Sequence, residues 1–354
     1  MFKILITGGC GFVGSNLGVS LKRKYPNYSI IAFDNLKRRG SELNIPRLRK
    51  NGIKFLHGDV RNIEDFSEVG PIDLLIEASA EPSVLAGINS SLEYLIKTNL
   101  NGSINCLNFA SNHKADFIFL STSRVYPIKH LENINFTESF SRFDISPDQN
   151  ILGVSANGIS ENFPLDGARS FYGATKLASE LIIQEFNELY GINTVVNRCG
   201  VITGPYQMGK VDQGVIVLWV ARHFWKSKLG YFGYGGQGKQ VRDILHIHDL
   251  FRLIDDQIHN INKYNGQIFN VGGGKDCSVS LRELTKICEE VTGNTIPIER
   301  VVDARVADVR IYITDNSKIT TRTGWKPEKK SKEIIIDIHE WIKENKIELY
   351  EILN

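Results

Sequence analysis

The first 200 residues alternate short apolar runs with longer segments whose apolar residues recur at helical spacing. We expect strands at Lys3–Thr7, Ile30–Phe33, Lys54–His57, Leu74–Ala78, Phe117–Ser121 and Thr194–Asn197, and helices at Val13–Lys24, Leu92–Ser111 and Tyr172–Tyr190. Strands joined through helices pair in parallel, and such sheets carry helices on both faces. The sequence therefore predicts an α/β fold of the Rossmann-like class, with a doubly wound parallel sheet.

The rhythm changes after about residue 200, where segments become shorter and less regular. Further helices are expected at Leu281–Val291 and Ile334–Lys346, and the chain of 354 residues is long enough for two domains. We predict one domain over residues 1–199, to which a segment near 240–262 returns, and a smaller α+β domain over 200–354. Pro127–Ala168 has little periodicity, and loops of that length are usually functional or mobile.

Charge and cysteine content argue against several kinds of partner and site. The net charge of +2 gives no reason to expect nucleic acid or an anionic membrane. The five cysteines are odd in number and lack Cys-x-x-Cys spacing, so neither a disulfide framework nor a zinc site is expected. His246 and His248 lie close together without an evident third ligand, so we predict no metal. We recognise no signal peptide or membrane span and expect a cytoplasmic protein.

A glycine-rich turn joins the first expected strand to the first expected helix. Gly8, Gly11 and Gly14, with Phe12 and Val13 between them, permit a tight turn and a close approach of the backbone to a pyrophosphate. The helix N-terminus adds N–H groups and the positive end of its dipole. A purely structural strand–helix turn is the alternative, but the strand before and the helix after favour a dinucleotide site.

Asp34 ends the second strand, 20 residues beyond Gly14. A carboxylate there accepts hydrogen bonds from the ribose hydroxyls and repels a 2′-phosphate, which favours NAD over NADP. Two alternatives stay open, because Asp34 is also a typical turn residue and Arg38 and Arg39 offer cations to a 2′-phosphate. Asp59, after the third strand, is a candidate for the adenine amino group, or an ordinary loop residue.

Tyr172 and Lys176 begin a helix four residues apart and therefore share one side of it. An ammonium about 5 Å from a phenol, at an effective dielectric of ~20, lowers the phenol's pKa by about 2 units. The phenol then serves as general base and acid near neutral pH. A solvated surface pair is the usual alternative, and the upstream glycine turn counts against it. The core face of this helix is expected at Leu177, Leu181, Ile182, Phe186 and Leu189.

Hydroxyl groups follow at Ser121–Ser123, at the end of the fifth strand. Active sites of such sheets lie beyond the carboxyl ends of the strands, so these hydroxyls are placed to join Tyr172 and Lys176. A helix cap or turn is the alternative role for the run.

These motifs, in this order, resemble the extended short-chain dehydrogenase/reductase family. The similar segments are Thr7–Gly14, Asp34–Leu36, Thr122–Tyr126 and Tyr172–Lys176, and the similarity extends over nearly the whole chain. The resemblance implies a catalytic triad of Thr122, Tyr172 and Lys176, with NAD bound by the first domain. It implies NAD contacts at Gly8, Gly11, Phe12, Val13, Gly14, Asp34, Asn35, Arg38, Asp59, Val60, Ala78, Ser79, Ala80, Asn99, Tyr172, Lys176 and Cys199.

A narrower similarity is to the CDP-paratose 2-epimerases, which act on CDP-linked 3,6-dideoxyhexoses. It is carried by Asp34–Glu42, Ala80–Ser83, Asp212–Gly214, Gly238–His246, Phe269–Gly273 and Asp308–Arg310, and by the long insert between Thr122 and Tyr172. This similarity implies a nucleotide-diphosphate sugar as substrate, with CDP favoured, and formation of CDP-tyvelose for lipopolysaccharide O-antigen. Substrate contacts are expected from Pro82, Ser83, Thr122, Ser123, Arg124, Gln213, Arg242 and Arg310.

Two departures from the pattern lie near the expected site. Glu77 stands where relatives often have His, and Pro127 stands where Gly is usual. Both departures bear on the choice of substrate within the family.

The residues after Thr122 bear on the type of reaction. Sugar-nucleotide 4,6-dehydratases resemble one another in carrying Asp and Glu there, whereas this chain has Ser123 and Arg124, which disfavours dehydration. Epimerisation needs Tyr172 to take a hydroxyl proton and Thr122 to hydrogen-bond the oxygen, while hydride passes to NAD and returns. For a 2-epimerase the oxidised carbon is carbon 2, and NAD is recycled.

Cationic and aromatic side chains of the second domain are candidates for binding the nucleotide. Arg242 and Arg310 suit a diphosphate, with internal ion pairs to Asp243 or Asp308 as the alternative. Four aromatic residues are candidates for stacking on the base, with a position in the core as the default expectation for each: Trp219, Trp225, Tyr231 and Tyr234.

Other functions stay open at this point. They are a UDP-sugar 4-epimerase, a sugar-nucleotide reductase and a non-catalytic NAD-sensing regulator, of which the last typically lacks a Tyr–Lys pair like Tyr172–Lys176. The family resemblance also implies a homodimer or homotetramer.

Overall fold

The computed structural model describes residues 1–88, 90–209, 213–303 and 307–354. These residues divide into two compact units. The first unit comprises residues 1–125, 171–198 and 251–268, and the second comprises 126–170, 199–250 and 269–354. The long insert before Tyr172 is therefore part of the second unit.

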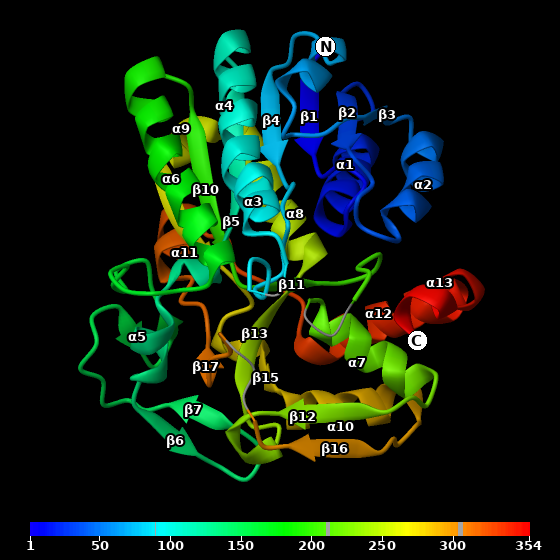
Figure 1. Ribbon diagram of the computed structural model, residues 1–354, viewed down its shortest axis with the longest axis vertical. Helices are drawn as coiled ribbons and strands as arrows, with labels where there is room; N and C mark the ends of the chain where they lie inside the picture. The colour runs from blue at the N-terminus through cyan, green and yellow to red at the C-terminus, as the bar shows by residue number, and fades with distance from the viewer. Residues whose placement is uncertain (89, 210–212, 304–306) are drawn as a thin grey trace. The chain divides into compact units, whose positions relative to one another are not determined.

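A seven-stranded sheet organises the first unit, in the order β14-β10-β5-β4-β1-β2-β3 (Figure 1). The pairs β1–β2, β2–β3, β1–β4 and β4–β5 are parallel, and the strand order reverses between β1 and β4. The prediction of a doubly wound α/β sheet is confirmed. The strands are β1 Lys3–Thr7, β2 Ser29–Asp34, β3 Lys54–His57, β4 Leu74–Glu77, β5 Asp116–Thr122, β10 Thr194–Cys199 and β14 Gln267–Val271.

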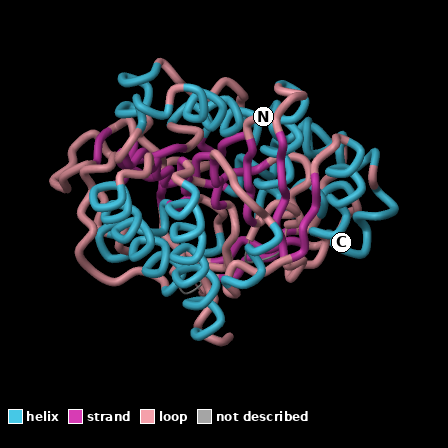
Figure 2. Tube along the Cα trace, turned by 90° about the horizontal axis from the view of Figure 1, so that it is seen from above, coloured by secondary structure: helices cyan, strands magenta, loops and turns pink. Residues whose placement is uncertain are grey.

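Helices cover both faces of this sheet (Figures 1 and 2). In Figure 1, α4 and α6 lie in front of the strands and α8 lies behind them. Lys24 of α1 forms an ion pair of 2.6 Å with Asp255 of α8, which holds these two helices together. The helices are α1 Phe12–Lys24, α2 Asn44–Lys50, α3 Leu92–Ile96, α4 Gly102–His113, α6 Phe171–Tyr190, α8 Ile247–His259 and α9 Ile261–Tyr264.

The helix expected over Leu92–Ser111 is interrupted. After α3 the backbone forms a π-helical turn at Lys97–Asn101, and α4 resumes at Gly102. A π turn inserts an extra residue and rotates the side chains that follow, and such turns are frequent at functional sites. Here the turn contains Asn99, which is fully buried.

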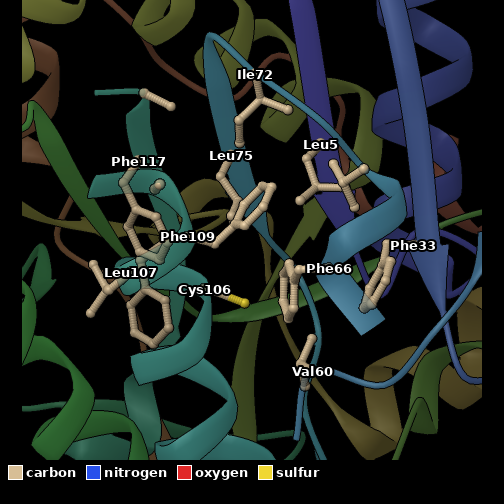
Figure 3. Packing of buried hydrophobic residues seen from close by; sticks show 14 of the residues in the cluster. Leu5, Phe33, Val60, Phe66, Ile72, Leu75, Cys106, Leu107, Phe109 and Phe117 are labelled. Atoms are coloured by element: carbon tan, nitrogen blue, oxygen red, sulfur yellow. The ribbon is translucent and has the colours of Figure 1, made fainter. Parts of the chain in front are cut away.

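The core of the first unit lies between the sheet and α4 and α6. Leu75 and Phe117 of the sheet meet Cys106, Leu107 and Phe109 of α4, as Figure 3 shows. All five are 9% exposed or less, so this face has lost most of its contact with water. Burial of such side chains stabilises a fold by about 1.5–3 kcal/mol each, which fixes the sheet against the helices.

The expected core face of α6 is confirmed for Ile182 and Phe186, which pack against the core, and is wrong for Leu181 and Leu189. Leu181 and Leu189 are 57% and 72% exposed, whereas the buried side of the helix carries Lys176, Glu180 and Ile183. The reason is that α6 turns polar residues toward the sheet, where they have partners: Glu180 pairs with Arg198, and Lys176 lies over the Phe119 ring. Apolar periodicity alone does not reveal such a face, because it assumes that buried residues are apolar.

The second unit contains several small sheets. One has the order β11-β13-β15, with β17 also on β13, and β12 pairs in parallel with β16. The strands are β6 Phe136–Glu138, β7 Phe143–Ile145, β8 Val154–Ser155, β9 Gly158–Ile159, β11 Val201–Thr203, β12 Leu229–Phe232, β13 Val241–His246, β15 Ser278–Ser280, β16 Ile298–Val301 and β17 Ile311–Tyr312. The helices are α5 Ile128–Glu132, α7 Val215–Phe224, α10 Leu281–Thr292, α11 Ser317–Thr323, α12 Ser331–Glu344 and α13 Lys346–Leu353.

The insert is more ordered than its sequence indicates. It contains α5 and two antiparallel strand pairs, β6–β7 and β8–β9. Among the described residues, we find no helix long and apolar enough to cross a membrane. The same residues contain no cluster of three or more potential metal-binding side chains, and all five cysteines are buried free thiols.

Candidate active site

The glycine turn between β1 and α1 has the geometry of an anion-binding loop. Gly8 has φ +65°, and a Cβ on Gly14 would lie 2.3 Å from the Gly8 carbonyl oxygen, so larger residues would disrupt both positions. The first turn of α1 contains no acidic side chain, and Gly11 has no side chain to cap it. The N-terminal N–H groups of α1 are thus available to a ligand with negative charge.

Asp34 closes one side of this turn from the end of β2. Its carboxylate accepts hydrogen bonds from the backbone N–H of Cys10 at 3.0 Å and of Leu36 at 2.8 Å. Burial raises the pKa of Asp34, and the backbone donors act in the opposite direction. The sequence prediction therefore has a structural basis, since Asp34 is held beside the turn at the carboxyl end of its strand.

The neighbouring candidates Asn35 and Asp59 contact each other. Asn35 donates to Asp59 at 2.9 Å, and Arg61 forms a 2.6 Å ion pair with the same carboxylate. Burial opposes ionisation of Asp59, but these donors win and lower its pKa to about 2. Asp59 is therefore an acceptor at neutral pH. Of the remaining candidates in this region, Val60 is buried and Arg38 is half-buried.

The segment after β4 lies directly against the glycine turn. Ala78 donates its N–H to the Thr7 carbonyl at 3.1 Å, and a Cβ on Gly8 would meet the Ala78 carbonyl oxygen at 2.7 Å. Ser79 donates its hydroxyl proton to Thr7 Oγ1 at 3.1 Å. The expected cofactor residues Ala78 and Ser79 therefore form one wall of the turn. Ala80, Pro82 and Ser83 follow in the same loop and are half-buried.

Asn99 connects this loop to α6. Its side chain accepts from the Glu81 N–H at 2.7 Å and donates to the Glu81 carbonyl at 3.1 Å and to Thr175 Oγ1 at 3.3 Å. All polar atoms of the Asn99 side chain are engaged within the protein. Its role in the structure is to fix the loop and the first turns of α6 in relation to each other.

The expected triad residues come from two adjacent elements. Thr122 is the last residue of β5, is 8% exposed and accepts a hydrogen bond from the Arg124 N–H at 3.2 Å. Helix α6, which begins with Phe171 and Tyr172, packs against the 3₁₀ turn Ser123–Val125. The structure therefore brings the hydroxyl of Thr122 and the first turns of α6 to the same edge of the sheet.

Lys176 is the most buried member of this group, at 2% exposed. Its ammonium lies 3.8 Å from the centre of the Phe119 ring, on strand β5. A cation over an aromatic face is attracted by the ring's quadrupole, and the attraction grows when water is excluded. Lys176 is therefore held against β5, one helical turn after the half-buried Tyr172 on α6.

Comparison with known proteins places this site in a family. Residues 4–272 match the model of the NAD dependent epimerase/dehydratase family. The protein is a member of the NAD-dependent epimerase/dehydratase family. It is 32% identical to CDP-paratose 2-epimerase of Salmonella typhi, over 96% of this chain and 98% of the relative. It is also 25% identical to dTDP-glucose 4,6-dehydratase of Streptomyces niveus, over 97% of this chain and 94% of the relative.

Solved structures of the same fold include the UDP-glucuronic acid 4-epimerase of Bacillus cereus, in complex with UDP-glucuronic acid and NAD. That structure superimposes with a TM-score of 0.79 at 22% identity and covers 97% of this chain and 99% of its own. This protein is thus an enzyme of the epimerase/dehydratase family with NAD as its cofactor. The tight Gly8–Gly14 turn and the uncapped N-terminus of α1 fit a pyrophosphate, which agrees with that assignment.

Arg242 and Arg310, the two arginines predicted from sequence to bind the diphosphate, have partners within this chain. Arg242 forms a 2.7 Å ion pair with Asp308 and donates to the Val309 carbonyl at 2.6 Å. Arg310 forms a 3.7 Å ion pair with Glu132 and lies 4.3 Å from the Phe136 ring centre. The internal ion pair considered from sequence is therefore present for Arg242, and Arg310 pairs with an acid that sequence reasoning did not consider.

The remaining second-unit candidates differ in surroundings. Gln213 has a buried Oε1 without a hydrogen-bond partner among the described residues, and Cys199 is 3% exposed at the end of β10. Asp212 belongs to the Asp212–Gly214 segment that resembles the CDP-paratose 2-epimerases, and it lies outside the described residues. Trp219 is core, because it is 4% exposed and donates to Thr285 at 2.9 Å.

Two buried carboxylates lie near the site; sequence reasoning missed Glu180 and noted Glu77 only as a departure from the family pattern, without predicting its burial. Glu180 forms a 2.7 Å ion pair with Arg198 and accepts a short hydrogen bond from Ser121. Glu77 ends β4, is 1% exposed and contacts Ser103. The sequence signals were a charge inside an apolar helix face for Glu180, and a charge ending an apolar strand for Glu77.

Proposed function

We propose that this protein epimerises a nucleotide-diphosphate sugar at carbon 2, with CDP-paratose as substrate and CDP-tyvelose as product. The observation that carries the proposal is the composition of the site. It contains the Tyr172–Lys176 pair, and its Thr122 is followed by Ser123 and Arg124. A dehydratase needs a carboxylic acid to protonate the departing hydroxyl, and neither Ser123 nor Arg124 is one. The 32% identity to a CDP-paratose 2-epimerase supports the same substrate.

The residues have separate roles in this reaction. Tyr172 removes the proton from the sugar hydroxyl and later returns it, with Lys176 stabilising the phenolate. Thr122 donates a hydrogen bond to the same sugar oxygen, where negative charge develops. The chemistry that NAD would supply when bound is reversible hydride transfer, by which carbon 2 would lose a hydride and regain it on the opposite face with no net oxidation. Between these two steps the keto-sugar must turn within the site.

The proposed cofactor contacts follow the turn and the strands around it. Gly8, Gly11, Phe12, Val13 and Gly14 would hold the pyrophosphate, and Asp34 the ribose. We further propose contacts from Asn35, Arg38, Asp59, Val60, Ala78, Ser79, Ala80, Asn99 and Cys199. Support comes from the close packing of Ala78 and Ser79 on the turn and from the position of Asp34 at the end of β2.

The proposed substrate contacts begin with Ser123 and Arg124, directly after β5, and with Pro82 and Ser83, in the loop after β4. Gln213 is proposed as well, because its buried amide oxygen has no partner among the described residues. Arg242 and Arg310 would bind the diphosphate, and both would then share their donors with Asp308 and Glu132. Loss of Arg242 or Arg310 should raise KM more than it lowers kcat.

A product assay tests the proposal. The protein is incubated with CDP-paratose or with UDP-galactose, without a reductant, and the sugar is analysed by NMR. Inversion at carbon 2 of CDP-paratose is the expected result, and inversion only at carbon 4 of UDP-galactose would replace the proposal with a 4-epimerase. Tyr172→Phe is the control, and it should abolish turnover. An unchanged rate in this variant would refute the catalytic role of Tyr172.

The location and assembly of the protein are also proposals. We propose a cytoplasmic enzyme, because all five cysteines are buried free thiols, as a reducing compartment permits. We further propose a homodimer or homotetramer. Light scattering of the purified protein tests this assembly, and a monomer at micromolar concentration would contradict it.

A further inference from the structure

Glu77 is a buried carboxyl group that interacts electrostatically with Lys176, one of the proposed catalytic residues. It ends β4, where its register partners are Thr7 on β1 and Phe119 on β5. It is 1% exposed, and its Oε2 has no hydrogen-bond partner among the described residues. Its Oε1 lies 2.5 Å from Ser103 Oγ on α4. A carboxylate has about four acceptor positions, so this environment provides far too few donors for the charged form.

The contacts of the Ser103 hydroxyl indicate which group carries the hydrogen in the contact between Ser103 and Glu77. Ser103 Oγ lies 2.5 Å from Glu77 and 2.8 Å from the Asn99 carbonyl, one helical turn earlier. A hydroxyl has one hydrogen and a carbonyl has none. When Ser103 donates to Asn99, the hydrogen in the contact between Ser103 and Glu77 must come from the carboxyl group. The geometry accommodates a protonated Glu77 that donates to Ser103, which in turn donates to Asn99.

The electrostatic surroundings of Glu77 also favour its protonated form. Burial raises the pKa of Glu77 to about 7, against the opposing effects of the Lys176 ammonium and the Ser103 hydroxyl. Two titratable groups face Glu77 from the helices packed on it, namely Lys176 of α6 and Cys106 of α4. Burial and the charge of Glu77 raise the pKa of the Cys106 thiol well above its usual range, so Cys106 stays neutral. The strand neighbours Thr7 and Phe119 do not titrate in this range.

Of these two titratable groups, Lys176 is therefore the charged one, and the effect of its charge on its surroundings depends on whether Glu77 is ionised. The interaction between two titrating groups is mutual, so Lys176 favours ionised Glu77 by the same energy by which ionised Glu77 favours charged Lys176. With Glu77 neutral, the full field of the ammonium acts on its surroundings. With Glu77 ionised, part of that field is cancelled.

We propose that Glu77 is a positioning residue that takes up and releases one proton near neutral pH and thereby sets how strongly Lys176 stabilises the Tyr172 phenolate. The proton passes between the Glu77 carboxyl and solvent, and no bond to substrate is made or broken. This inference rests on the proposed roles of Tyr172 and Lys176. As the pH falls, Glu77 becomes neutral and Tyr172 ionises more readily, which spreads the titration of Tyr172 over a wider pH range.

A spectroscopic titration tests the proposal without substrate. Phenolate absorbance near 295 nm is followed against pH in the intact NAD-loaded protein, and the curve of Tyr172→Phe is subtracted to isolate Tyr172. The same difference is measured in the Glu77→Gln background. Glutamine keeps the shape of the neutral acid but cannot ionise, so the Tyr172 midpoint should fall by about one pH unit and the curve should steepen. Equal midpoints and slopes in the two backgrounds would overturn the proposal.

Asp116→Asn is the matched control. Asp116 is also a carboxyl group whose pKa burial raises, but it begins β5, at the end of the strand opposite to Thr122. This variant should leave the Tyr172 midpoint unchanged. A shift as large as that of Glu77→Gln would show a general effect of removing a buried carboxylate and would refute a specific role for Glu77. If Glu77→Gln does not fold, the wild-type curve decides, since a titration of ordinary single-site width contradicts the coupling.

An activity profile separates this proposal from the proposed function. If the protein inverts carbon 2, the acid limb of kcat/KM should move to lower pH in Glu77→Gln by the same amount as the phenolate midpoint. If it turns over neither sugar nucleotide, the function proposal fails while the phenolate titration still decides the role of Glu77. A shifted phenolate midpoint with an unshifted acid limb would show that Glu77 does not act on the reaction through Tyr172.

Discussion

Two buried glutamates of the first unit have opposite environments. Glu180 accepts hydrogen bonds from both Nε and Nη of Arg198, at 3.0 and 2.7 Å, and another from Ser121. Glu77 has one hydroxyl neighbour, Ser103, and an oxygen without a partner among the described residues. A buried charge is stable when donors surround it, and otherwise it is neutralised by a proton. Glu180 therefore has the donors that a buried carboxylate needs, whereas Glu77 lacks them and is suited to take up a proton.

The largest expected effect is on the Glu180 side. Arg198→Leu should destabilise the protein by about 3–5 kcal/mol, because it leaves a carboxylate buried without its cation. Urea unfolding at pH 7 measures this change in the free energy of unfolding. The double variant Glu180→Leu/Arg198→Leu is the control, and it should recover much of the loss. A cost below about 1 kcal/mol for the single variant would mean that the pair behaves as a surface ion pair.

The next effect concerns the pH dependence of stability from Glu77. Its pKa is about 7 in the folded protein and 4.5 for an ordinary glutamate, so folding favours the protonated form. As the pH rises from about 4.5 to about 7, the unfolded chain ionises first and the folded state loses about 3 kcal/mol from this group. Above pH 7 the loss is complete, and below pH 4.5 it is absent.

Glu77→Gln removes this contribution. The free energy of unfolding is measured from pH 4.5 to pH 8 in the wild type and the variant, and the difference between the two curves isolates Glu77 from other titrating groups. The wild type should lose stability relative to Glu77→Gln as the pH rises. A difference that stays constant with pH would mean that Glu77 keeps one charge state in both folded and unfolded protein.

The smallest expected effects come from the two serines. Ser121→Ala should cost about 1–2 kcal/mol, because it removes one hydrogen bond to Glu180 while the bonds from Arg198 remain. Ser103→Ala should cost more at pH 8 than at pH 5, because an ionised Glu77 then has lost its hydroxyl donor. Urea unfolding of both variants at both pH values checks this contrast. A pH-independent cost of Ser103→Ala would contradict the titration of Glu77.

The sequence predicted the features that rest on local pattern. The strands of the parallel sheet follow from short apolar runs, and the turn from Gly8 to Gly14 follows from glycine spacing. Proximity of Thr122 to α6 was also predictable, because the carboxyl ends of parallel strands share one edge. These predictions need only backbone geometry and the location of apolar residues.

Features that depend on tertiary surroundings were not predictable. The π turn at Lys97–Asn101 contains Asn99, whose side chain is bonded to Glu81, and helical periodicity in the sequence does not reveal such a one-residue insertion. The buried face of α6 carries Lys176 and Glu180, which hydropathy places outside. The sequence marked Glu77 only as a departure from its relatives, because its charge state depends on burial and donor count.

The most direct test of the proposed reaction uses CDP-paratose that carries deuterium at carbon 2. If a hydride leaves carbon 2 and the same hydride returns to the other face, the CDP-tyvelose formed in ordinary water should retain the deuterium at carbon 2, as NMR can show. Epimerisation by loss and regain of a proton would exchange the label with solvent. Complete loss of deuterium from the product would contradict the account.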